Sequence, residues 1–125
     1  MMKHLSQLTR HQFLNRIYNY KQYPDEFIYI GTSPCVVVVG SSGSIFCREL
    51  EPALEIMAKR NKDHYGIYYI DVSADEELAK ALKTDKFPVV YLCPVKSTPT
   101  IFKGTINIRE ISEMAGRVLT ALRKM

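Results

Sequence analysis

The apolar residues of this chain follow two patterns, short unbroken runs and runs spaced three or four residues apart. The unbroken run at 35–39, rich in β-branched residues, is typical of a strand covered on both faces, and further strands are predicted at 67–72, 89–93 and 100–103. The spaced runs predict amphipathic helices, beginning near residues 10, 44, 76 and 108. We expect the first helix to run to about Tyr20 and residues 27–30 to form a short edge strand.

Helix starts are marked by polar residues placed three positions apart, the pattern of a capping box. Three such pairs occur: Thr9 with Gln12, Ser73 with Glu76, and Asn107 with Glu110. Leu8 and Phe13 are spaced as a hydrophobic staple for the first helix. The second helix has an apolar face of Cys47, Leu50, Leu54 and Met57, and it contains Pro52, which we expect to kink it.

The order of these elements predicts the fold class. Strands separated by helices favour parallel crossover connections, whereas the two consecutive strands before the last helix favour an antiparallel hairpin. We therefore expect an α/β domain with a central mixed sheet of four to five strands and helices on both faces. Residues 1–125 are predicted to form one domain, with an N-terminal helix and edge strand in 1–31 and the core in 32–125.

Composition narrows the possible partners. The chain has 125 residues, a net charge of +4 and a pI of about 9.0. Its cations are scattered, which argues against nucleic-acid binding because phosphate affinity needs clustered cations. No apolar run is long enough to span a bilayer and no signal peptide is visible, so we expect no membrane partner and a cytoplasmic location. The oligomeric state stays open.

The three cysteines, Cys35, Cys47 and Cys93, do not suggest a secreted disulfide framework, because their number is odd. No pair has the spacing of metal ligands and the histidines are far apart, so no metal or other cofactor is expected. Cys35 and Cys93 are predicted to lie on neighbouring antiparallel strands, at the end away from Cys47. Both are expected to be reduced core residues, and whether they are close enough to bond stays open.

Several residues at the ends of the predicted helices and strands carry a family resemblance. Cys47 stands five residues before Pro52, Asp71 closes the strand before the third helix, Phe87-Pro88 precedes the next strand, and Gly104 follows the last one. With these residues the chain resembles thioredoxin over almost its whole length, which implies the thioredoxin fold. Segments 23–34 and 94–105 also look like thioredoxins of the Bacteroides group.

The resemblance breaks down at the redox centre. The family's active-site stretch reads Trp-Cys-Gly-Pro-Cys, whereas the corresponding stretch here is Gly43-Ser44-Ile45-Phe46-Cys47. Ser44 therefore takes the place of the first cysteine, giving a degenerate Ser-X-X-Cys motif. The resemblance also places Val38 and Ile67 where the family has a buried aspartate and its lysine partner, so both members of that charged pair are replaced by aliphatic residues.

These departures bear on thiol chemistry, which needs a thiolate attacker. Ser44 cannot attack a disulfide, and a serine becomes a nucleophile only beside a base. We expect it to be an N-cap that accepts from the N–H of Phe46 or Cys47. Cys47 is either a shielded apolar side chain or a lone reactive thiol near a helix N-terminus, and we favour the first interpretation.

The resemblance further implies a cis peptide bond at Phe87–Pro88 and a peptide-binding groove. The groove residues would be Ile45, Phe46, Phe87, Pro88 and Gly104, with Ile106 beside them. The first hypothesis is a thioredoxin-like module that binds a peptide or protein without dithiol turnover. The alternative is a monothiol redox protein or sensor that uses Cys47 in cell redox homeostasis. A scaffold acting through an oligomer interface is neither supported nor excluded.

Overall fold

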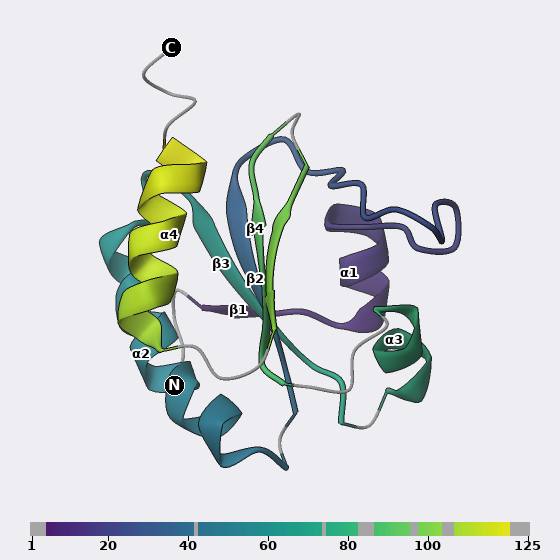
Figure 1. The fold of residues 1–125 in the computed structure, drawn as a ribbon, viewed down its shortest axis with the longest axis horizontal. Helices are drawn as coiled ribbons and strands as arrows, with labels where there is room; N and C mark the ends of the chain where they lie inside the picture. Colours follow the sequence, from purple (N-terminus) through teal and green to yellow (C-terminus); the bar gives the residue numbers. More distant parts are fainter. Residues whose placement is uncertain are drawn as a thin grey trace.

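The structure, a computed structural model, describes residues 5–41, 43–73, 75–82, 87–95, 98–103 and 107–120, and only the backbone of Phe46 and Thr120. The described elements follow one another along the chain in the colours of Figure 1. They are β1 (Ser6–Gln7), α1 (Arg10–Arg16), β2 (Cys35–Gly40), α2 (Ile45–Arg60), β3 (Gly66–Asp71), α3 (Glu76–Ala81), β4 (Val89–Cys93), β5 (Thr100–Lys103) and α4 (Ile108–Thr120).

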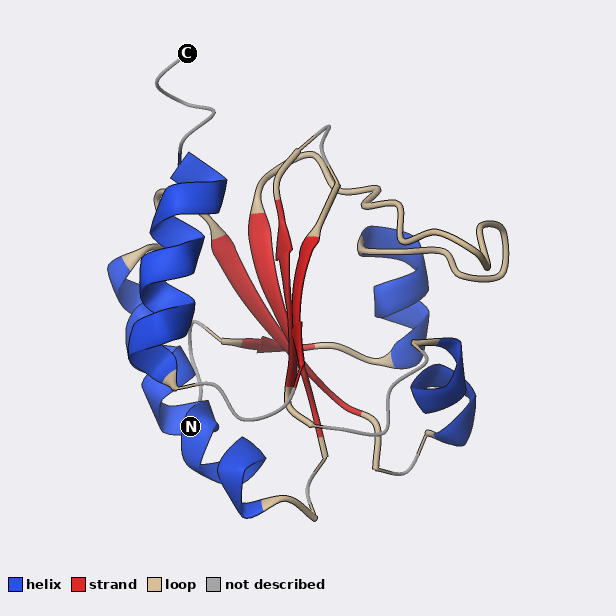
Figure 2. Cartoon of the chain, in the orientation of Figure 1, coloured by secondary structure: helices blue, strands red, loops and turns tan. Residues whose placement is uncertain are grey.

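The strands form one mixed sheet in the order β1-β3-β2-β4-β5. β1, β3 and β2 run parallel, whereas β4 runs antiparallel to both β2 and β5. Helices α1 and α3 cover one face of the sheet and α2 and α4 cover the other (Figure 2). The predicted fold class is therefore confirmed.

Each face of the sheet has its own apolar core, and the alternation of side chains along β2 divides that strand between them. Val36 and Val38 pack in the cluster that contains residues of α2 and α4. Val37 and Val39 pack in the cluster that contains residues of α1 and α3. All of β2 is buried, which explains why its sequence shows no polar alternation.

Two of the three predicted capping boxes hold their helices as expected. The N–H of Gln12 donates to Thr9 Oγ1 over 3.1 Å, and the N–H of Thr9 donates to Gln12 Oε1 over 2.9 Å. At α4, the N–H of Glu110 donates to Asn107 Oδ1 over 2.9 Å, and the Asn107 amide donates to Glu110 Oε1 over 2.7 Å. Both caps thus satisfy N–H groups in the first turn of the helix that would otherwise be unpaired.

The cap predicted at Ser73 is wrong. The N-cap of α3 is Asp75, whose Oδ1 accepts from the N–H of Leu78 over 3.1 Å. Ser73 belongs instead to the turn after β3, where its N–H donates to Asp71 Oδ1 over 2.9 Å. Both residue types can cap a helix, so the spacing to Glu76 alone did not decide between them.

The N-terminal region also differs from its prediction. Helix α1 ends at Arg16, because the N–H groups of Ile17 and Tyr18 both bond to the carbonyl of Phe13. Residues 27–30 form no strand. The N–H of Ile30 bonds to the carbonyl of Ile17, beyond the end of α1, and the Phe27 ring stacks on Tyr18. The edge strand is β1, a segment of two residues that pairs with β3.

Candidate functional site

The residues singled out by the degenerate motif meet at one edge of the sheet. β2 ends at Gly40, and the chain then runs directly into Ser44 and α2. The neighbouring strand β4 starts at this edge, because Val89 is paired with Val39 on one side and with Lys103, the last residue of β5, on the other. The start of α2, the Phe87-Pro88 pair and the end of β5 therefore share one edge.

Ser44 is the N-cap of α2, as predicted. Its backbone is extended, with φ −94° and ψ 124°, and its side-chain oxygen accepts from the N–H of Cys47 over 3.4 Å. Its carbonyl accepts from the N–H of Arg48 over 3.2 Å, which is the first bond of the helix. The hydroxyl is thus engaged in holding the helix start, the ordinary role of a serine at this position.

Cys47 lies in the first turn of α2 with its side chain 0% exposed. Helix periodicity accounts for this burial, because Leu50 and Leu54 lie on the same face and both pack in the core. The thiol is free rather than disulfide-bonded. A reagent or a substrate disulfide could reach it only if the start of the helix moved.

The other side of the edge is formed by the segment before β4. The peptide bond between Phe87 and Pro88 is cis, Pro88 is buried and Phe87 is half-buried. At the start of α2, which lies at the same end of the sheet, the Ile45 side chain is 62% exposed. This end of the sheet thus presents an exposed apolar side chain as well as the backbone segment that precedes the paired part of β4.

Solved structures with the same arrangement of elements identify this architecture. Chloroplastic thioredoxin z superposes with a TM-score of 0.68 at 15% identity, covering 94% of this chain and 96% of that one. The Trx4 domain of ERdj5 superposes with 0.67 at 14%, covering 98% and 99%. The J-Trx1 fragment of ERdj5 gives 0.73 at 14%, covering 96% of this chain and 52% of that one. The chain has a thioredoxin fold.

Sequence comparison adds no closer relationship: no protein-family model matches the chain and no curated protein matches it. Identities of 14–15% mark divergence far beyond that of close relatives. The thioredoxin fold is therefore established, and the chemistry must be argued from this chain's own residues.

The face of the sheet that α2 and α4 cover is apolar in this thioredoxin fold. Val38 is 0% exposed and Ile67 is 2% exposed, and both pack in the cluster shared with α2 and α4. Among the residues whose burial is described, no charged or strongly polar side chain is buried. A thiol here therefore has no buried carboxylate from which to gain or to which to lose a proton.

Tyr69 is a site residue that the sequence analysis missed. It pairs with Val38, and its hydroxyl lies against Gly40, only 2.2 Å from where a Cβ of residue 40 would stand. Burial, followed by the charges of Cys47 and Glu51, raises the Tyr69 pKa above its usual value, so its hydroxyl stays neutral. The alternation of strand residues could have indicated it, because Tyr69 lies two positions after Ile67 on the same face.

Three residues predicted at the groove lie wholly or partly outside the described residues. Gly104 and its neighbour Ile106 lie outside the described residues, and for Phe46 only the backbone is described. The described part of the groove is therefore Ile45, Phe87 and Pro88, and the pairing of Lys103 with Val89 brings β5 to the same edge.

The described residues contain neither a group of metal ligands nor a helix that could span a membrane. No group of three or more His, Cys, Asp or Glu residues is placed there to hold a metal ion. None of the described helices is both long and apolar enough to cross a bilayer.

Proposed function

We propose that this protein is a binding module of thioredoxin fold that holds an extended peptide or protein segment without dithiol turnover. The observation that carries the proposal is the state of the two motif residues. Ser44, at the position of the attacking cysteine, bonds to the N–H of Cys47, and the Cys47 side chain is 0% exposed. Neither residue presents a thiolate to a substrate disulfide.

The peptide part of the proposal rests on the same edge of the sheet. Residues Phe87 and Pro88 precede the first paired residue of β4, so an extended segment can lie beside them as an added strand would. Ile45, at the start of α2 at the same end of the sheet, offers an exposed apolar side chain. Chloroplastic thioredoxin z, a protein of the same fold, shows type-specific target recognition.

The chemistry of the edge indicates the kind of segment that it binds. The described contacts are an isoleucine, a half-buried phenylalanine and a proline, and none of them is charged. We therefore propose an extended, uncharged segment with apolar side chains. Backbone pairing supplies affinity and Ile45 contributes to the choice of side chain.

The monothiol alternative requires Cys47 to react with solutes. Complete burial of its side chain opposes this alternative, because an attacking thiolate must be exposed at least in part. The apolar core between the sheet and α2, which contains Val38 and Ile67, opposes it as well, since an apolar core disfavours a buried charge.

Binding is tested by screening a library of extended peptides and measuring the affinity of the selected sequence by calorimetry. Ile45→Gln should weaken binding several-fold, because it removes apolar contact area at the edge. Ile56→Gln is the matched control, since Ile56 is a similarly exposed isoleucine on the same helix, 55% against 62%. Equal affinities for the two variants, or the selection of no peptide, would contradict the proposed groove.

Absence of turnover is tested separately by reduction of insulin disulfides with dithiothreitol as the electron donor. We expect the protein and its Cys47→Ala variant to give the same rate as the donor alone. Turnover by the unmodified protein that Cys47→Ala abolishes would establish the monothiol alternative. Because binding and turnover are measured independently, each part of the proposal can fail alone.

A further inference from the structure

A pair of thiols, Cys35 and Cys93, lies at the other end of β2 from the degenerate motif. Cys35, the first residue of β2, is directly paired with Cys93, the last residue of β4. Both side chains pack in the cluster on the α1 side of the sheet, and both thiols are free. They therefore point to the same face from neighbouring positions.

This placement suits a disulfide without rearrangement of the strands. Residues opposite each other on antiparallel strands have Cα atoms about 4.5 or 5.5 Å apart, depending on the type of pair. Disulfides occur at Cα separations of roughly 4.4–6.8 Å. Cys35 and Cys93 are register partners and pack in the same core cluster, so their thiols lie on the same face of the sheet.

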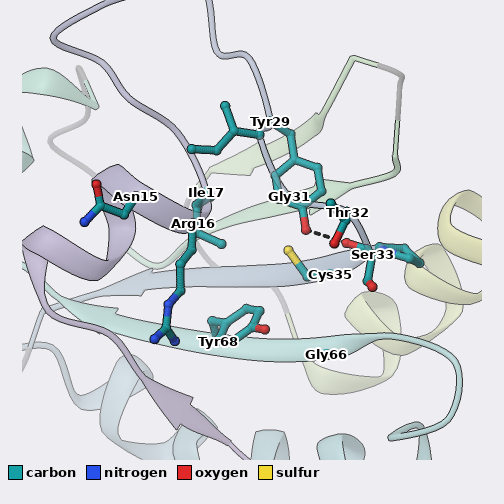
Figure 3. A pocket seen from close by; sticks show the side chains of 12 residues that line it. Asn15, Arg16, Ile17, Tyr29, Gly31, Thr32, Ser33, Cys35, Gly66 and Tyr68 are labelled. Atoms are coloured by element: carbon teal, nitrogen blue, oxygen red, sulfur yellow. Dashed lines mark hydrogen bonds between the residues drawn. The ribbon is translucent and has the colours of Figure 1, made fainter.

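Cys35 also lines a pocket of about 320 Å³ (Figure 3). The wall around the sulfur includes Tyr29, Arg16 and Tyr68. In Figure 3 the Cys35 sulfur points toward the Tyr29 hydroxyl. Because Cys35 is only 1% exposed, a reagent must be small to reach it from this pocket.

The two thiols have different proton affinities. The hydrogen bond from Cys93, and then that from Tyr29, lower the pKa of Cys35. The same bond to Cys35, together with burial, raises the pKa of Cys93. Tyr29 has one hydroxyl proton, which it can donate either to the Ser33 carbonyl or to the Cys35 sulfur. Cys93 and Tyr29 thus both favour the thiolate form of Cys35, whereas Cys93 keeps its proton.

We propose that Cys35 and Cys93 form a second thiol site, at which a small hydroperoxide entering from the pocket oxidises Cys35 and Cys93 then closes a cross-strand disulfide. Cys35 is the attacking residue, Cys93 the resolving residue and Tyr29 a positioning residue. The site is independent of the proposed peptide groove, which lies at the opposite end of β2.

The reaction balances with hydrogen peroxide as the oxidant. The Cys35 thiolate attacks one peroxide oxygen, the O–O bond breaks, and Cys35 becomes a sulfenic acid while hydroxide leaves. The Cys93 sulfur then attacks the Cys35 sulfur, the S–O bond breaks, and the departing hydroxide takes the Cys93 proton to become water. Two sulfurs are oxidised to one disulfide, and one peroxide is reduced to hydroxide and water.

The test treats the full-length protein with hydrogen peroxide, blocks the remaining thiols after denaturation, and analyses tryptic peptides by mass spectrometry. Trypsin leaves Cys35 and Cys47 in one peptide, because the chain has no Lys or Arg between Lys21 and Arg48, whereas Cys93 falls in another peptide. We expect these two peptides to become disulfide-linked, with fragment ions placing the link at Cys35. Failure to form this link in the folded protein, or a link at Cys47, would overturn the proposal.

Two variants test the assigned roles. Cys93→Ser should stop the reaction at the sulfenic acid, so that dimedone labels Cys35; absence of this label in folded protein would contradict the role of Cys35. Tyr29→Phe should slow the loss of thiols several-fold, whereas Tyr65→Phe, a buried tyrosine in the other core, should not change it. Equal rates for these two variants would exclude the positioning role of Tyr29.

Discussion

The side-chain oxygen of Ser44 lies 3.4 Å from the backbone nitrogen of Cys47, and it accepts the hydrogen bond that fixes the first turn of α2. A thioredoxin-like motif normally places a reactive sulfur where this oxygen stands, according to the resemblance of the chain to that family. The serine at this position stabilises the helix, and the cysteine that follows it points into the core with 0% exposure. The serine thus has a structural role at the start of α2, and the proposed absence of dithiol turnover rests on this cap and on the burial of Cys47.

Removal of the cap should destabilise the protein modestly. Loss of an N-cap serine costs typically about 1 kcal/mol, and the long bond at Ser44 places Ser44→Ala near the lower end, about 0.5 kcal/mol. Urea unfolding measures the change. Ser44→Asp is the matched control, because it keeps an acceptor and adds a charge that the helix N-terminus favours. A larger loss for Asp than for Ala would contradict the capping role.

The aliphatic pair under the motif should not tolerate one charge alone. Val38→Asp or Ile67→Lys buries a single ionisable group among apolar side chains, and each should cost about 3–5 kcal/mol. The double variant should lose less than the sum of the two, because the charges can then pair. Free energies of unfolding from a double-mutant cycle measure this coupling. Strict additivity would show that the two positions do not act as a pair.

Stability should fall in alkaline solution because of buried tyrosines. Burial raises the pKa of Tyr91 from 10.0 to about 12 in the folded protein. Between these values the unfolded chain loses the proton that the folded chain keeps, so the free energy of unfolding decreases with rising pH, by up to about 1.4 kcal/mol per pH unit for such a group.

Denaturant unfolding between about pH 9 and pH 11 measures this slope around the ordinary tyrosine pKa of about 10. Tyr91→Phe should make the slope shallower, whereas Tyr23→Phe, at an exposed tyrosine, should leave it unchanged. The same slope in the protein and in Tyr91→Phe would contradict the predicted contribution of Tyr91.

Much of the fold could be predicted from the sequence, because strong periodic signals coincide with the cores. The unbroken run in β2 and the spaced face of α2 are examples, and both match the buried residues. Short elements were harder to predict from the sequence. β1 has two residues and takes its structure from pairing with β3, and α1 ends early because its last N–H groups converge on the carbonyl of Phe13.

The candidate site could be predicted in part. The cap at Ser44 follows from residue type and position, and the burial of Cys47 follows from its helix face. Tyr69 was missed because its role depends on packing against Gly40 from another strand. The direct pairing of Cys35 with Cys93 depends on the register of β2 and β4, which composition does not give.

The most direct test of the account is the alkylation rate of Cys47 in folded protein, measured in a Cys35→Ser/Cys93→Ser background so that one thiol remains. We predict that labelling is slow, and that it accelerates sharply when denaturant unfolds the chain, because the folded side chain is 0% exposed. Fast labelling of the folded protein, with a pH midpoint well below the ordinary thiol value of about 8.5, would contradict the account and identify Cys47 as a reactive monothiol.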